Sequence, residues 1–226
     1  MLNSKRVLLL IGSPKKSNSS SDSLGSYLIN KLSVEGFTTD KINILSYLKT
    51  ESGIENFLKA VNSSDILILS FPLYVDSLPA GVIKAFELIA QHRKQRSLNK
   101  KQKMMVIANC GSPEALHNNV ALDICKCFAS HTGFIWTGSL ALGGGSIVGG
   151  RPLKSLGGMV KNIIKALDIT AIALSNNTSV PLEAKKLMEK PLMPSWLYTF
   201  IGDVAWKKQA KKFGANKDLY SKPYEI

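Results

Sequence analysis

Val7-Leu8-Leu9-Leu10-Ile11 is a continuous apolar run that ends in Gly12-Ser13-Pro14. Such a run without alternation is typical of a strand buried on both faces, as in a parallel sheet. A serine-rich stretch follows, and Leu24, Leu28 and Leu32 then recur at helical spacing. The segment therefore predicts a strand, a polar loop and a helix, in that order.

The same alternation continues along the chain. Further strands are expected at 40–45, 65–71, 103–109 and 134–142, and helices at 20–34, 54–61, 79–91, 113–131 and 153–175. Strands that alternate with helices of this kind form right-handed crossovers in a parallel sheet. We predict an α/β fold with a doubly wound five-stranded parallel sheet in the flavodoxin-like order 2-1-3-4-5. The expected domain spans 1–178, and a helical extension over 179–226 packs on the core or on a partner subunit.

Composition limits the class of protein. Of the 226 residues, 45% are hydrophobic and 20% are charged, which suits a globular domain with a real core. No stretch approaches the ~20 apolar residues that span a bilayer, so we expect a soluble, cytoplasmic protein. The three cysteines do not suggest a disulfide scaffold. Cys125 and Cys127 are two residues apart on an expected helix and point to different faces, so no metal site is predicted.

The net charge of +13 is concentrated in two places. Basic residues gather between Arg93 and Lys103, and again at Lys207, Lys208, Lys211 and Lys212. No zinc-finger spacing or aromatic RNA-binding strand accompanies them, so we predict no nucleic-acid partner. A solvated basic face is the preferred interpretation, and attraction of phosphate-bearing ligands stays open.

The loop after the first strand predicts an anion site. Free backbone N–H groups and the positive end of the helix dipole both favour an anion at a helix start. The alternative is a single serine cap in a flexible loop, but a cap needs only one serine. Neither a GxxxxGK[ST] nor a GxGxxG pattern is present, which argues against a P-loop and against a resident dinucleotide at this loop.

Two more loops follow expected strands. After the third strand, Pro72-Leu73-Tyr74-Val75 offers backbone amides and a flat ring, which suits a flavin but also a plain turn with a packed tyrosine. After the fourth strand, Asn109-Cys110-Gly111 offers an amide that can donate and accept, and a glycine that permits close approach. Ligands of doubly wound sheets bind at the carboxyl ends of the strands, so the three loops are expected to converge.

Together the three loops resemble those of the NADPH-dependent FMN reductase and NAD(P)H:quinone reductase group of flavodoxin-like proteins. The resemblance lies in Gly12-Ser13-Pro14-Lys15, in the segment from Phe71 to Ala80 and in Asn109-Cys110-Gly111, and it spans roughly residues 5–145. It implies bound FMN. The residues it implies for the phosphate are Ser13, Lys15, Ser19, Ser20 and Ser21; those for the flavin ring are Pro72, Leu73, Tyr74, Val75, Asn109, Cys110 and Gly111.

The resemblance also implies an activity. NADH or NADPH would act as a transient reductant, and electrons would pass through FMN to a quinone, a nitro or azo compound, or another small acceptor. No protein acid or base is needed, so no catalytic residue is named. A homodimer is implied as well. The alternatives are a flavodoxin-type electron carrier without its own substrate and a non-catalytic flavodoxin-like binding protein.

Two features lie outside the resemblance. Gly143 to Gly150 follows the fifth strand and is either a lid over the flavin or a spacer. Helical pieces at 183–188 and 194–213 form the tail, which carries Trp196, Tyr198, Phe200 and Trp206 beside its lysines. These aromatic residues could dock the tail on the core, complete a dimer or touch a membrane surface, and docking is the preferred interpretation.

Overall fold

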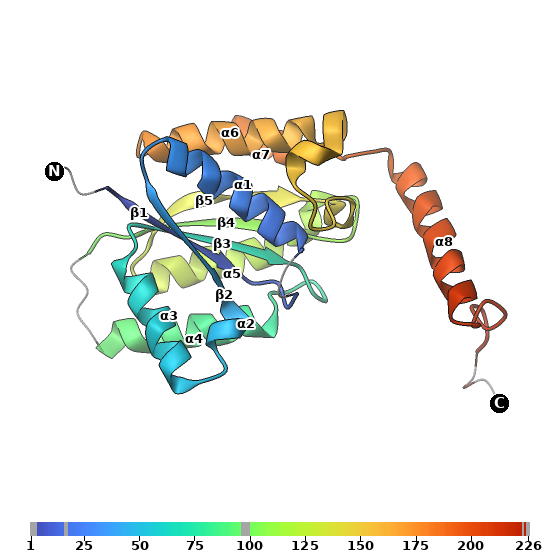
Figure 1. Ribbon diagram of the computed structural model, residues 1–226, viewed down its shortest axis with the longest axis horizontal. Coiled ribbons are helices and arrows are strands. Elements are labelled where there is room, and N and C mark those ends of the chain that lie inside the picture. The colour runs from blue at the N-terminus through green and yellow to red at the C-terminus, as the bar shows by residue number, and fades with distance from the viewer. Residues whose placement is uncertain (1–3, 16–17, 96–99, 223, 225–226) are drawn as a thin grey trace. The chain divides into compact units, whose positions relative to one another are not determined.

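The computed structural model of the protein describes residues 4–15, 18–95, 100–222 and 224. Within them, five strands form one sheet in the order β2-β1-β3-β4-β5, and every neighbouring pair is parallel (Figure 1). The strands are β1 (Arg6–Ile11), β2 (Thr38–Asn43), β3 (Ile66–Pro72), β4 (Lys103–Asn109) and β5 (Ile135–Leu142). The predicted fold class and strand order are confirmed.

Helices cover both faces of the sheet (Figure 1). On one face lie α1 (Ser20–Val34), α6 (Lys161–Ser175) and α7 (Leu182–Met188), and on the other lie α3 (Glu51–Ser63), α4 (Ala80–Gln95) and α5 (Asn119–His131). The short helices are α2 (Ile44–Tyr47) and the 3-10 segments η1 (Ala115–Asn118), η2 (Gly145–Ile147) and η3 (Leu153–Val160). Among the described helices, none is both long and apolar enough to cross a membrane.

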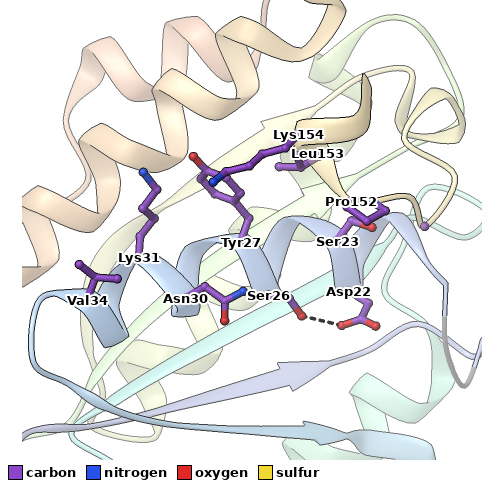
Figure 2. Close-up of a pocket in the computed structure, with 11 residues that line it drawn as sticks. Asp22, Ser23, Ser26, Tyr27, Asn30, Lys31, Val34, Pro152, Leu153 and Lys154 are labelled. Carbon is purple, nitrogen blue, oxygen red and sulfur yellow. Dashed lines mark hydrogen bonds between the residues drawn. The ribbon is translucent and has the colours of Figure 1, made fainter. Parts of the chain in front are cut away.

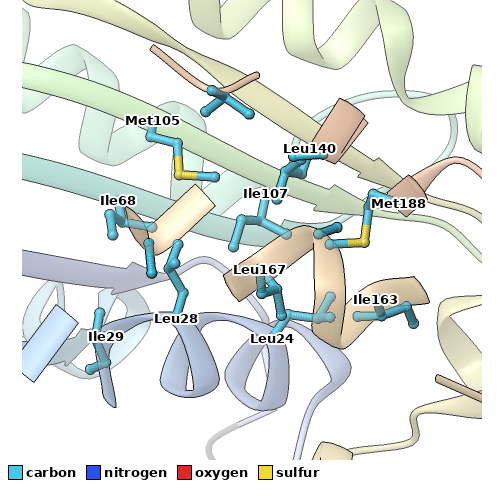
Figure 3. Close-up of a cluster of buried hydrophobic side chains, with 14 of the residues drawn as sticks. Leu24, Leu28, Ile29, Ile68, Met105, Ile107, Leu140, Ile163, Leu167 and Met188 are labelled. Carbon is cyan, nitrogen blue, oxygen red and sulfur yellow. The ribbon is translucent and has the colours of Figure 1, made fainter. Parts of the chain in front are cut away.

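The apolar run that opens the chain divides its side chains between two cores. Leu9 and Ile11 belong to the cluster under α1, α6 and α7, whereas Leu8 and Leu10 belong to the cluster under α3, α4 and α5. This follows from the two-residue period of a strand, and it explains why all five residues from Val7 to Ile11 are apolar. Figure 3 shows part of the first cluster, where Leu24 and Leu28 of α1 lie beside residues of the strands and of α6.

Several expected boundaries differ from those in the structure, such as the helix expected over 113–131, which is divided into η1 and α5. Two further differences have a clear physical reason. The second strand ends at Asn43, and Ile44, expected to continue it, begins α2 and is buried by it. The single helix expected over 153–175 is divided into η3 and α6, because Gly157 has φ of 60° and ψ of −147°, which no helix contains.

The chain forms two compact units, residues 1–192 and 193–226. The division lies further along the chain than the expected one after residue 178. The physical reason is α7, whose Ala184, Leu187 and Met188 are buried in the same cluster as Leu140 of β5. The second unit contains α8 (Ser195–Lys212). Docking of this extension on the core or on a partner subunit stays a prediction.

Phe57 of α3 tests the second core. Its side chain is fully buried against the sheet, so Phe57→Ala should lower the free energy of unfolding by about 3–5 kcal/mol through lost burial and a residual cavity. Denaturant unfolding measures the change. Phe200→Ala, on the exposed side of α8, is the matched control, with an expected change within about 0.5 kcal/mol. Equal effects of the two substitutions would contradict the packing described here.

Candidate functional site

A cleft of about 240 Å³ lies where the carboxyl ends of β1, β3 and β4 meet. This is the point at which the chain leaves β1 in one direction and β3 in the other, where doubly wound sheets bind ligands. Its wall consists of the loops that follow the strands, and its residues are Ser13, Lys15, Asn18, Ser19, Ser20, Ser21, Pro72, Leu73, Tyr74, Asn109, Cys110, Gly111, Ser146 and Gly149. Every residue predicted for the site is among them except Val75.

The amino end of α1 forms the floor of the part of the cleft nearest β1. Ser19 caps the helix, because its Oγ accepts a hydrogen bond of 3.1 Å from the backbone N–H of Asp22. The first N–H groups of a helix have no partner within the helix, and the dipole places partial positive charge beside them. Lys15 lies on the same wall and adds a full positive charge. This end of the cleft is therefore suited to an anion. Lys16 and Ser17 lie outside the described residues.

Two of the predicted serines hold the loops together. Ser20 Oγ donates a 2.7 Å hydrogen bond to the carbonyl oxygen of Gly145. Ser21 is buried, and its Oγ accepts a 2.9 Å hydrogen bond from Nδ2 of Asn109. The Ser20 proton is therefore already used within the protein, whereas the Ser21 hydroxyl retains its own proton for a further bond. A contact of either hydroxyl with phosphate stays a prediction.

Asn109 connects three segments of the chain. Its Nδ2 donates to Ser21 Oγ and, at 3.0 Å, to the carbonyl oxygen of Phe71, and its backbone carbonyl accepts a 2.7 Å bond from the N–H of Leu73. The side chain is 5% exposed. A buried amide with its donors satisfied fixes the positions of its partners. Asn109 thus sets the spacing between the start of α1 and the end of β3.

The loop after β1 approaches β3 closely. The N–H of Gly12 donates a 2.8 Å hydrogen bond to the carbonyl oxygen of Ser70, and Ser70 Oγ donates to the carbonyl oxygen of Ser21 at 2.8 Å. A Cβ at position 12 would overlap with Val82 and would lie 2.8 Å from Cβ of Phe71. Glycine is therefore required at position 12 for the chain to turn from β1 into the cleft.

The glycine-rich segment after β5 forms the remaining wall. The N–H groups of Gly144 and Gly145 donate to the carbonyl oxygens of Ser112 and Cys110, at 2.6 and 2.8 Å. Gly143 to Gly145 are buried, and Ser146 and Gly149 line the cleft. The segment is packed against the loop after β4, which favours a fixed wall over a lid. Sequence reasoning did not assign Asn18, Ser146 or Gly149 to the site, and it interpreted the glycine run after the fifth strand only as a lid or a spacer.

The loop after β3 ends in a strained two-residue turn. Tyr74 and Ser77 exchange two backbone hydrogen bonds of 3.0 Å, and the two residues between them, Val75 and Asp76, have φ of 47° and 55°. Positive φ at both central positions defines a type I′ turn, which favours Asn-Gly. A β-branched residue there is strained by about 1–3 kcal/mol. The side chain of Val75 is 99% exposed and does not line the cleft, so its predicted ring contact stays a prediction.

Charge in the cleft is positive. Burial raises the pKa of the Cys110 thiol, although the hydrogen bond from Asn118 opposes this, so Cys110 stays neutral at physiological pH. Asp22, in the first turn of α1, is paired with Lys41 at 2.9 Å. Since Lys15 is the charged residue on the wall, an anionic ligand meets no competing carboxylate there. Cys125 is buried and Cys127 is exposed, so they face different ways, as their spacing predicts.

A larger cavity, about 530 Å³, runs along the outer side of α1. Figure 2 shows Ser26, Tyr27, Asn30 and Lys31 of α1 facing it, with Pro152 to Lys154 on the opposite side. Tyr27 Oη donates to Asp168 at 3.0 Å, and Lys31 pairs with the same carboxylate at 2.9 Å. The residues that line this cavity come from α1 and from the segment 150–154, and none comes from the loops after β3 and β4, so the smaller cleft, where three strand-end loops meet, is the better candidate site.

Comparisons with known proteins agree with this geometry. A family model described as NADPH-dependent FMN reductase matches residues 5–132. The fold is similar to that of an FMN-dependent NADH-azoreductase from Bacillus anthracis in complex with FMN (TM-score 0.56, 15% identity, 76% of this chain and 100% of that chain). It is also similar to an NAD(P)H:quinone oxidoreductase from Methanothermobacter marburgensis (TM-score 0.52, 16% identity, 76% and 96%). At these identities the likeness shows the fold alone. No curated protein sequence matches the chain significantly.

The strain in the turn at the mouth of the cleft can be measured. The double variant Val75→Asn, Asp76→Gly has the two residues that a type I′ turn prefers. Its free energy of unfolding should therefore be about 1–2 kcal/mol higher than that of the parent. Val34→Asn, at another exposed valine with helical backbone, controls for the change of side chain and should give no gain. A double variant no more stable than the parent would show that the turn is unstrained.

Proposed function

The chain belongs to the NADPH-dependent FMN reductase family, and on that premise we propose that the cleft between the loops after β1, β3 and β4 holds FMN and receives a nicotinamide and a small electron acceptor in turn. Because it belongs to this family, the protein is an NAD(P)H-dependent FMN oxidoreductase. The observation that carries the placement is the convergence of the three loops. Ser19 and Gly111, which are 92 positions apart in the sequence, line one cleft together with residues of the loop after β3.

The residues present fit the phosphate of FMN. The start of α1 offers N–H donors without helical partners, and Lys15 offers a cation on the same wall. Asp22 is neutralised by Lys41, so no carboxylate repels the phosphate from that helix turn. Ser13 Oγ accepts a 3.3 Å bond from the N–H of Lys15 and so shapes the loop around the anion. We assign the phosphate to this end of the cleft.

The residues also fit a flat ring. Pro72, Leu73 and Tyr74 at the end of β3, and Asn109, Cys110 and Gly111 at the end of β4, line the cleft from two adjacent strands. A Cβ placed on Gly111 would meet no atom of the described chain within 4 Å, so the backbone there borders open space that a ligand can approach closely. The 46% exposed Tyr74 leaves this end of the cleft open to solvent. A second planar molecule can therefore reach the ring end of the cleft without displacing the phosphate end.

Bound FMN would supply redox chemistry that no side chain of this protein provides. The chain itself binds the phosphate, orients the ring between two loops and leaves access for exchange of substrates. The neutral Cys110 and the satisfied amide of Asn109 keep the ring environment uncharged. No GxGxxG loop exists to retain a dinucleotide, which supports the nicotinamide as a visiting substrate.

The acceptor we propose is a small quinone, nitro or azo compound, because the residues assigned to the ring end of the cleft are apolar, aromatic or uncharged, and Lys15, the charged residue of the lining, is assigned to the phosphate end. The second candidate is an electron carrier without its own substrate. Carriers of that kind use acidic faces to meet basic partners, and a net charge of +13 opposes this. The homodimer implied by the family resemblance stays a prediction.

Gly111 tests the placement of the ring. Gly111→Val fills the open space beside the backbone, so FMN affinity should fall about tenfold or more, as expected from the roughly 1–3 kcal/mol that overpacking costs. Titration of the apoprotein with FMN, followed by flavin fluorescence, measures the affinity. Gly158→Val is the matched control, because a Cβ there also meets no atom within 4 Å and the residue lies away from the cleft. If Gly111→Val binds FMN with unchanged affinity, the flavin ring does not lie beside this loop.

Anaerobic reduction separates the reductase from the carrier. The FMN-loaded protein should lose its visible flavin absorbance rapidly when NADH or NADPH is added, and a quinone, nitro or azo compound should restore it. Stopped-flow absorbance with each acceptor ranks the substrates. A protein that binds FMN but is not reduced by either nucleotide would favour the carrier, and an acceptor that restores no colour is not a substrate.

A further inference from the structure

The tail that follows residue 192 has a defined helix of its own. Helix α8 begins after Pro194 and ends at Lys212. Gly214, two residues after its last residue, has φ of 73°. The N–H of Ala215 donates to the carbonyl oxygen of Ala210, and that of Gly214 to Lys211. This pair of bonds is the Schellman motif, which stops a helix. The tail is therefore an element with fixed ends, and its surface can be assigned residue by residue.

Large apolar side chains of α8 are exposed. Trp196, Phe200 and Val204 follow one another at intervals of four residues, so they lie on one side of the helix. Trp196 is 72% exposed and Phe200 is 62% exposed. Leu197 and Ile201 widen the same side by one position. An apolar stripe of this size on a helix indicates a binding surface, because soluble proteins rarely leave such groups in water.

The same stripe becomes basic in the last turns of the helix. Lys207 and Lys211 continue the line of Trp196 and Phe200, because eleven residues correspond to about three helical turns. Lys208 and Lys212 lie beside them, and no acidic residue occurs between Val204 and Lys217. All four lysines are exposed. One side of α8 therefore carries aromatic and aliphatic groups at its start and cations at its end.

Charge limits what can cover this stripe. The tail has six lysines against Asp203, Asp218 and Glu225, and the whole chain carries +13, so the residues before the tail are strongly basic too. A second copy of the chain has the same positive charge, which disfavours pairing through the lysines. The complementary partner is anionic and has an apolar interior that accepts tryptophan and phenylalanine.

We propose that α8 docks this reductase on an anionic lipid bilayer surface. Trp196, Phe200 and Ile201 enter the boundary between headgroups and acyl chains, where aromatic rings are favoured. Lys207, Lys208 and Lys211 contact lipid phosphates, and their long apolar stems allow this while the helix lies against the surface. The docking does not depend on which acceptor the cleft uses.

A bilayer fits the stripe better than a nucleic acid does. Nucleic-acid surfaces offer phosphates to the lysines, but they have no continuous apolar phase for Trp196, Phe200, Ile201 and Val204. Exposed aromatic residues can stack on single-stranded bases, yet the aliphatic residues of this stripe gain nothing from stacking. The mixture of aliphatic, aromatic and cationic groups is the composition expected at a lipid interface.

Vesicle binding by the full-length, FMN-loaded protein tests the proposal. Vesicles of phosphatidylcholine alone are compared with vesicles that also contain phosphatidylglycerol, by co-sedimentation and by the tryptophan emission spectrum. Binding and a blue shift are expected only with the anionic lipid. Raising the salt from about 0.1 M to about 1 M, which shortens the screening length from about 10 Å to about 3 Å, should weaken the binding.

Variants separate the two parts of the stripe. Lys207→Gln with Lys208→Gln should weaken binding by about 30-fold, as expected for the loss of two lysines at an anionic surface. Lys185→Gln with Lys186→Gln makes the same change of charge on α7 and should leave binding unchanged. Trp196→Ala with Phe200→Ala should abolish the blue shift. FMN content and anaerobic reduction by NAD(P)H, measured on every variant, should stay at the parent level, which separates failure of the docking from failure of the reductase.

Any of the following results would overturn the proposal. They are equal binding to neutral and anionic vesicles; no binding to either; equal weakening by the α7 control pair; and binding of a single-stranded oligonucleotide that is tighter than binding to anionic vesicles and is lost in the Lys207, Lys208 variant. If the Trp196, Phe200 variant changes only the sedimentation coefficient of the protein and not its lipid binding, the stripe is an interface between copies of the chain.

Discussion

The amide of Asn109, at the end of β4, holds the start of α1 and the end of β3 at the spacing on which the cleft depends. Its two donor bonds reach Ser21 at the start of α1 and the carbonyl oxygen of Phe71 at the end of β3. Both partners are buried, so a broken bond would leave a desolvated polar group without compensation. Two further hydrogen bonds extend this network. One joins Ser70 of β3 to Ser21, and the other joins Ser20 to Gly145 in the loop after β5. Some of the serines that predict a phosphate site in the first loop therefore also form the hydrogen bonds that give the cleft its shape.

The two units of the chain divide the chemistry between them. The first unit supplies a cleft whose loops are held together by internal hydrogen bonds, with the start of α1 and Lys15 at one end and an open, apolar end at the other. The second unit supplies an exposed stripe of aromatic residues and lysines. The excess of positive charge therefore has two separate consequences: it favours a phosphate-bearing cofactor in the cleft and an anionic surface beneath the tail.

Strain is concentrated at the mouth of the cleft. The core of the sheet has apolar residues in ordinary strand geometry, whereas Val75 and Asp76 adopt positive φ at the edge of the site. Such strain persists only where the surrounding structure fixes the backbone, and here the two bonds between Tyr74 and Ser77 do so. The side chain of Val75 is exposed, so its burial does not offset the strain of the turn. What the turn achieves is the position of Tyr74 beside the cleft.

The sequence by itself determined the sheet, the order of its strands and the three loops that meet. Buried parallel strands must be apolar on both faces, and the carboxyl ends of such strands meet at one edge, so Ser13, Tyr74 and Gly111 could be brought together without coordinates. Only the tertiary structure decided which groups are still free to bind. Ser20 and Asn109 use their hydrogen-bonding groups on distant carbonyls and hydroxyls, and such partners cannot be inferred from local patterns. Val75 leaves the cleft because a two-residue turn reverses the chain. Asn18, Ser146 and Gly149 enter it because the loop after β5 packs against the segment between β1 and the start of α1, where Ser20 bonds Gly145 and Asn18 lies beside Gly150. The division after residue 192 depended likewise on the burial of α7, a contact between segments far apart in the sequence.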